Sequence, residues 1–146
     1  MNTTIPDATE HWEHFYHSSD IGVRGCGPSK TSAFTQAALA LMAVIVDLKT
    51  VEAKTRVKIV CAAESDDLLF FEWINALVFE IATRHIVFSK FFLTLGAGKL
   101  QAEAWGEPVH VSRHQPAVEI KGATFTELRV EQDADGNWLA QCVVDV

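Results

Sequence analysis

The spacing of apolar residues predicts two helices. Between Ser29 and Val46, apolar side chains recur at steps of three and four residues, which gives a helix one apolar face. A second helix is expected from Ser65-Asp66-Asp67 to about Thr83, because acidic residues in a first turn favour the helix dipole. Its apolar residues lie on all sides, so we expect this helix to be well buried or covered by a partner.

Alternation of apolar and polar residues predicts strands in the rest of the chain. In the first half, the expected strands are His11–Tyr16, Ile21–Cys26 and Arg56–Ala63. In the second half they are Ile86–Leu95, Lys99–Gly106, Val118–Gln132 and Asn137–Val146. Glu107–Pro116 is expected to be a loop rich in residues that break strands, and Pro108–Pro116 is the best candidate for a mobile loop.

Two helices, a β-rich second half and no regular βαβ alternation predict an α+β fold. We expect the helices to pack on an antiparallel or mixed β-sheet. The length of 146 residues fits one domain over residues 1–146, with residues 1–10 as a flexible N-terminal tail.

The formal net charge is −7 and no basic stripe is visible, which disfavours tight direct binding of nucleic acid. A basic protein partner or a metal ion suits this charge better. No apolar run reaches the roughly 18 residues that span a bilayer, and the first residues lack the features of a signal peptide. We therefore expect a cytoplasmic protein that does not bind membranes.

Cysteine usage agrees with a reducing compartment. Cys26, Cys61 and Cys142 are widely spaced, and each lies in an apolar run typical of a strand. We interpret them as reduced packing residues. A zinc site is not expected, because the chain has no Cys-x-x-Cys pair.

Acidic residues stand near both ends of the chain. Asp20 lies in the turn between the first two strands, and Asp145 precedes Val146. If the fold brings these segments together, the converging negative charges favour a bound cation or a cationic partner. The alternative is that Asp20 bonds its own turn backbone and that Asp145 meets water.

Other polar residues have simpler interpretations. His11, His14 and His17 cannot converge on one metal, because residues three apart on a strand point to opposite faces. His17 keeps more interest, since it stands beside Asp20. Lys121 could form an ion pair with Glu119 on a solvated strand face.

Several motifs in order resemble those of the archease family over nearly the whole chain. They are His17-Ser18-Ser19-Asp20-Ile21-Gly22, Phe34-Thr35-Gln36-Ala37-Ala38-Leu39-Ala40-Leu41, Asp47-Leu48, Glu72-Trp73-Ile74-Asn75, Val87-Phe88-Ser89, Trp105-Gly106-Glu107-Pro108, Arg113-His114, Glu119-Ile120-Lys121 and Asp145-Val146. Each motif alone is weak, but their order and spacing together are specific.

The resemblance implies a small α+β protein with a strand-helix-strand-strand module. It also implies a non-catalytic cofactor of the RtcB-type RNA ligase, one that promotes guanylylation and multiple turnover of that enzyme in RNA splicing or repair. A divalent-cation site is implied at Asp20, Asp145 and Val146, the last through its backbone or terminal oxygen. Calcium is the expected ion, with magnesium or manganese as alternatives. Lys121 and His17 are then expected to contact the ligase.

The chain departs from the family pattern around these positions. Tyr16 and Val118 stand where many members have Asp and Thr, and Thr124-Phe125-Thr126 replaces a Thr-Tyr-His motif. Two hydrogen-bonding side chains near Lys121 are thereby lost. Glu72 replaces a usual Asp.

Two other functions remain open at the level of sequence. The apolar helix around residues 70–79 suggests a chaperone-like module that binds other proteins. A free-standing metal hydrolase is less favoured, because no base or nucleophile is evident beside the acidic residues.

Overall fold

The structure is a computed structural model that describes residues 10–146. In the first half, the elements are β1 (His11–His17), β2 (Asp20–Gly27), α1 (Lys30–Ile45), the short 3-10 helix η2 (Leu48–Thr50), β3 (Thr55–Ala62) and α2 (Asp66–Arg84). The second half contains β4 (Ile86–Gly96), β5 (Lys99–Pro108), α3 (Val111–His114), β6 (Gly122–Ala123), β7 (Arg129–Gln132) and β8 (Trp138–Asp145). The predicted tail, apart from Glu10, lies outside the described residues.

The α+β prediction is confirmed, but the strands form two sheets where the sequence suggested one. The larger sheet has five strands in the order β1-β2-β8-β6, with β7 also pairing β8. The smaller sheet has three strands in the order β3-β5-β4. Every strand pairing among the described residues is antiparallel.

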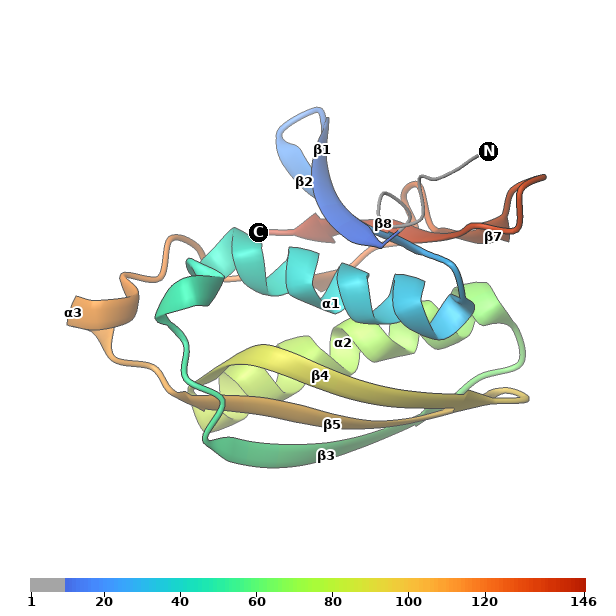
Figure 1. Cartoon of the computed structure of the whole chain (residues 1–146). Coiled ribbons are helices and arrows are strands. Elements are labelled where there is room, and N and C mark those ends of the chain that lie inside the picture. Colours follow the sequence, from blue (N-terminus) through green and yellow to red (C-terminus); the bar gives the residue numbers. More distant parts are fainter. Residues whose placement is uncertain (1–9) are drawn as a thin grey trace, which may run out of the picture.

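The two long helices lie between the sheets and fill the core (Figure 1). Both predicted helices are confirmed, and each begins with a serine cap: Ser29 accepts from the Ser32 N–H, and Ser65 from the Leu68 N–H. Trp73 of α2 is fully buried and donates its indole N–H to the carbonyl of Phe34 on α1 at 3.1 Å. This bond satisfies the polar atom of a large core side chain.

A glycine allows α1 to pack closely on the larger sheet. A Cβ atom at Gly25 of β2 would overlap the carbonyl oxygen of Ala33 and the backbone nitrogen of Ala37. Both alanines are fully buried. The small residues on the two elements therefore set the distance between helix and sheet.

The predicted strand Val118–Gln132 is wrong. The structure has only the short strands β6 and β7 there, separated by an irregular segment. Glu127 has a φ of 56°, a left-handed conformation that cannot continue a strand. Thr124 donates through both its N–H and its hydroxyl to the carbonyl of Val143, so this segment bonds to β8 in an irregular way.

Candidate functional site

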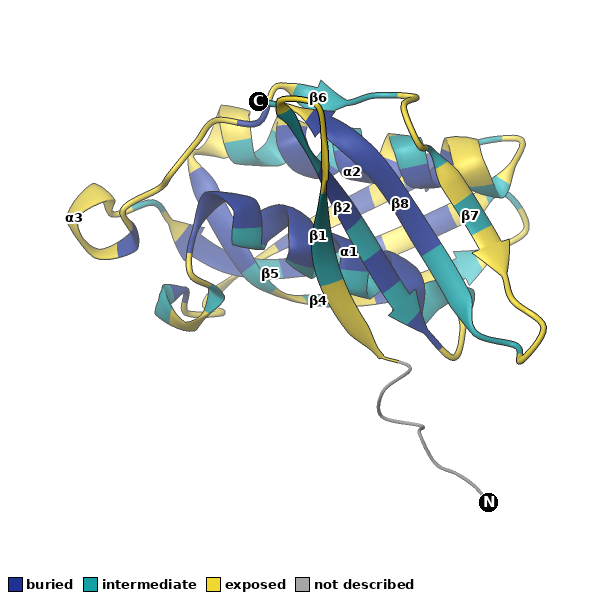
Figure 2. Cartoon of the chain, turned by 90° about the horizontal axis from the view of Figure 1, so that it is seen from above, coloured by how far each residue is buried: buried dark blue, intermediate teal, exposed yellow. Residues whose placement is uncertain are grey.

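The pairing of β2 with β8 brings the first hairpin to the last residues of the chain. The register runs through Ile21 opposite Val144. The register ends at this pair, and Asp20 and Asp145 are the next residues on β2 and β8. We call the end of the larger sheet that carries these two residues the edge. Seen from above, the C-terminus lies near the β1–β2 hairpin (Figure 2), and from the side the tip of that hairpin projects away from the sheet (Figure 1). The meeting of these segments, on which the sequence hypothesis depended, is thus present in the backbone.

The hairpin tip also places His17 at this edge. His17 pairs with Asp20 across the two-residue turn Ser18-Ser19. Ser18 has a φ of 56°, a positive value typical of tight hairpin turns. The side chain of His17 is exposed, and that of Asp20 is half-buried. His17 therefore lies where a partner docking on the hairpin tip could contact it.

Lys121 flanks the same edge from the other side. Its backbone N–H donates to the carbonyl oxygen of Asp145 at 2.7 Å, and the next residue, Gly122, pairs with Asp145. The Lys121 side chain is exposed. Among the described residues, no ion pair joins Lys121 to Glu119, so the simpler interpretation of that lysine is not what the structure displays.

A side chain of α2 fixes the segment that carries Lys121. Asn75 accepts a hydrogen bond from the backbone N–H of Ala123 in β6 at 2.9 Å. Asn75 is half-buried, whereas Glu72, one turn earlier, is exposed. The motif Glu72-Trp73-Ile74-Asn75 thus contributes Trp73 to the core and Asn75 to the support of the edge.

The donor atoms at the edge suit a hard cation. Asp20 and Asp145 carry carboxylates, and Val146 offers a backbone oxygen. Calcium and magnesium prefer such oxygen ligands. The three residues lie at one end of the neighbouring strands β2 and β8.

A buried ion-pair network was missed by the sequence interpretation, which placed a loop over Glu107–Pro116 and a mobile segment over Pro108–Pro116. Glu107 is the last residue but one of β5, and its side chain is almost completely buried. Arg113 donates two hydrogen bonds to its carboxylate, at 2.7 and 2.8 Å, and the Glu52 N–H donates a third at 2.7 Å. These bonds keep the pKa of Glu107 well below its ordinary range.

His114 completes the network through both of its ring nitrogens. The His110 N–H donates to its Nδ1 at 2.8 Å, so the proton lies on Nε2, which donates to Glu107 at 3.2 Å. Arg113 and His114 belong to the one-turn helix α3, which the network ties to β5. The signal in the sequence was an acid followed six and seven residues later by a base and a histidine.

His14 of β1 makes a contact inside the protein. The ring Nε2 of His14 lies 2.7 Å from the carbonyl oxygen of Ala40 on α1, so that histidine is bonded within the fold. Cys61 and Cys142 are buried and free, as predicted. Burial raises the pKa of Cys61 to about 11 and that of Cys142 to about 12, which makes both thiols unreactive.

None of the helices in the described part of the chain is both long and apolar enough to cross a membrane.

Comparison with known proteins assigns the chain to a family. The archease protein family matches residues 12–146. The protein archease of Pyrococcus furiosus is 33% identical over 139 residues, covering 92% of this chain and 98% of that protein. The protein archease of Methanosarcina acetivorans is 31% identical over 147 residues, covering 97% of this chain and 100% of that protein.

Solved structures agree with this assignment. The solution structure of a protein from Methanobacterium thermoautotrophicum superposes with a TM-score of 0.81 at 29% identity, covering 92% of this chain and 98% of that one. The crystal structure of a Thermotoga maritima archease, described as a possible chaperone, gives a TM-score of 0.57 at 18% identity, with 100% and 98% covered, and so shows the fold alone. From these matches and the shared architecture, we conclude that the chain belongs to the archease family.

Proposed function

We propose that this protein is a non-catalytic activator of an RtcB-type RNA ligase, acting in RNA splicing or repair. In this proposal, Asp20, Asp145 and Val146 hold a divalent cation, with calcium favoured. The observation that carries the proposal is the β2–β8 register, which pairs Ile21, next to Asp20, with Val144, next to Asp145. Family membership supports the same site.

Each residue at the edge has a defined task in this proposal. Asp20 and Asp145 supply carboxylate oxygens from the adjacent strands β2 and β8. When bound, the cation supplies positive charge at an otherwise acidic tip. Lys121 and His17, both exposed, stand on either side of the two carboxylates and contact the ligase or its nucleotide phosphate.

The overall charge favours such a partner. The chain carries a net charge of −7, so it is attracted to the basic surroundings of a nucleotide-binding site. The protein then binds the ligase itself, and the ligase binds the RNA. Direct tight binding of RNA by this chain is not part of the proposal.

The test is covalent guanylylation of the cognate ligase with GTP, measured with and without the protein. We expect acceleration by the natural chain and its loss in the double variant D20A/D145A. The control is E64A/E131A, which removes the same charge from two exposed residues away from the edge. The proposal fails if the natural chain gives no acceleration, or if D20A/D145A accelerates as well as the control.

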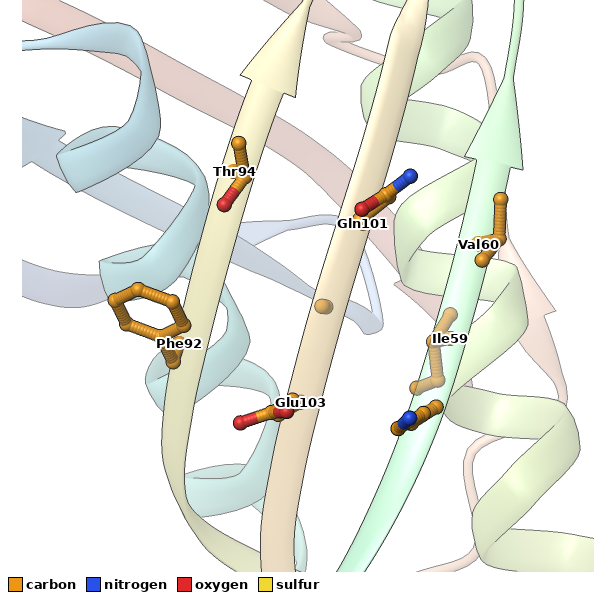
Figure 3. Close-up of a pocket in the computed structure, with 8 residues that line it drawn as sticks. Ile59, Val60, Phe92, Thr94, Gln101 and Glu103 are labelled. Carbon is orange, nitrogen blue, oxygen red and sulfur yellow. The ribbon is translucent and has the colours of Figure 1, made fainter.

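Exposed apolar side chains favour a second candidate, a chaperone-like module. On the outer face of the three-stranded sheet, Val60 is 71% exposed and Phe92 is 64% exposed. They line a shallow cavity of about 220 Å³, together with Gln101 and Glu103 (Figure 3). The apolar residues of α2 that first suggested this function are mostly buried in the core, with Phe79 as an exposed exception.

Light scattering of an aggregating client protein separates the two candidates. A chaperone suppresses aggregation of several unrelated clients, and V60S/F92S weakens that suppression. A dedicated ligase activator leaves scattering unchanged and retains guanylylation activity in V60S/F92S.

A further inference from the structure

Three different metal-binding side chains converge where β1 begins and β2 ends. His11 pairs with Cys26 in the β1–β2 register, and Glu13 lies two residues further along β1. A ring nitrogen of His11, a carboxylate oxygen of Glu13 and the sulfur of Cys26 all lie within 4.8 Å of one another. Alternation along a strand sets all three on one face of the sheet.

Glu13 is held in place by groups that reach into the core. Arg24 donates from Nη1 to its Oε1 at 2.7 Å and from Nε to the side-chain oxygen of Gln141 at 2.8 Å. Gln141 is fully buried and donates in turn to the carbonyl of Glu127 at 3.0 Å. The Arg24 guanidinium also lies 4.5 Å from the ring centre of Phe15. Outer contacts of this kind orient a metal-binding carboxylate.

We propose that His11, Glu13 and Cys26 form a binding site for a zinc ion. Imidazole nitrogen, thiolate sulfur and carboxylate oxygen are the three ligand types that zinc takes in proteins, and three protein ligands leave a fourth position for water. The spacing of 4.8 Å or less needs only small side-chain adjustments to reach tetrahedral contact. The thiolate distinguishes this site from the oxygen-only edge at Asp20.

The zinc site is separate from the proposed ligase-contacting edge. Cys26 stands six residues along β2 from Asp20, which corresponds to about 20 Å. His11 also lies just outside the family match, which begins at residue 12. Because β1 is an outermost strand of its sheet and pairs only with β2, a zinc ion that bridges His11 to Cys26 would fasten the start of β1 to β2.

The experiment is titration of the untagged, reduced full chain with Co²⁺, a spectroscopic substitute for zinc. We expect one equivalent to bind, with a thiolate-to-cobalt charge-transfer band that zinc abolishes by displacement. C26S removes the band, and H11A or E13Q weakens cobalt affinity by at least about 10-fold, since even outer-contact losses cost that much. C61S is the matched control and keeps the band.

Zinc affects stability independently of the spectrum. The melting temperature of the natural chain rises with added zinc, and that of H11A, which keeps every cysteine, does not. The proposal is overturned if no charge-transfer band appears, if C26S keeps it, or if H11A and E13Q bind cobalt as tightly as the natural chain. The cobalt spectrum and the melting temperature test the zinc site alone, whereas guanylylation with D20A/D145A tests the proposed function alone.

Discussion

Glu107 shows how a single residue can hold a segment that looks unstructured in the sequence. Its carboxylate accepts hydrogen bonds from Arg113, His114 and the Glu52 backbone. Arg113 and His114 lie six and seven residues after Glu107, but the Glu52 N–H comes from a distant stretch, so the local spacing shows only part of the network. A Cβ atom at the preceding residue, Gly106, would overlap the Val87 carbonyl oxygen, so only glycine fits at that position of β5.

The network predicts a loss of stability in acid. The pKa of Glu107 in the folded chain lies below its ordinary value of 4.5. At pH values between the folded and the ordinary pKa, the unfolded chain therefore binds more protons than the folded chain. Its contribution to stability is therefore present above pH 4.5 and is lost as the pH falls below that value. We expect E107Q to be less stable than the natural chain at neutral pH, with the difference shrinking in acid. Urea unfolding at about pH 7 and about pH 3 measures both quantities. An equal difference at both values would contradict this account.

Asn75 supplies a second prediction at this scale. N75A leaves the Ala123 N–H without its acceptor and is expected to cost about 1 kcal/mol of unfolding free energy. It should also weaken ligase activation, since β6 carries the backbone next to Lys121. The exposed Glu72 provides the control: E72A should change stability by less than about 0.5 kcal/mol. Equal effects of N75A and E72A would contradict the conclusion that Asn75 supports the segment that carries Lys121.

At the level of elements, periodicity located the helices and most strands well. α1 and α2 have caps and apolar spacing that act locally, so the sequence carries their signals directly. The strand expected over Val118–Gln132 failed because Thr124 and Glu127 make irregular contacts with β8. The division into two sheets depends on long-range pairing, which alternation does not encode.

The contact between α1 and β2 gives the clearest element-scale prediction. G25A forces a methyl group into the backbone of α1, and we expect a loss of about 1–3 kcal/mol, as for overpacked cores. G96A is the matched control, because a Cβ at Gly96 meets nothing within 4 Å. Its effect should stay within about 0.5 kcal/mol. Denaturant unfolding compares the two, and a tolerated G25A would show that helix and sheet can separate without cost.

At the scale of the whole molecule, the fold brings residues that are far apart in sequence to the same end of the larger sheet. Asp20 and Asp145 were candidates from their residue type, but the sequence alone left open whether they meet or are ordinary turn and surface acids, and the family resemblance favoured a shared site. The β2–β8 register brings together the strand ends that carry them. In the same way, the absence of a Cys-x-x-Cys pair argued against zinc, whereas strand pairing places His11 and Glu13 beside Cys26.

The most direct test of the proposed site is a double-mutant cycle on ligase guanylylation with D20A, D145A and D20A/D145A. Two carboxylates that hold one cation act as a unit, so each single variant should lose nearly as much acceleration as the double variant. Circular dichroism confirms that all three variants are folded. If the two single effects simply add, or if neither substitution reduces the rate, the two residues do not share an ion and the account is contradicted.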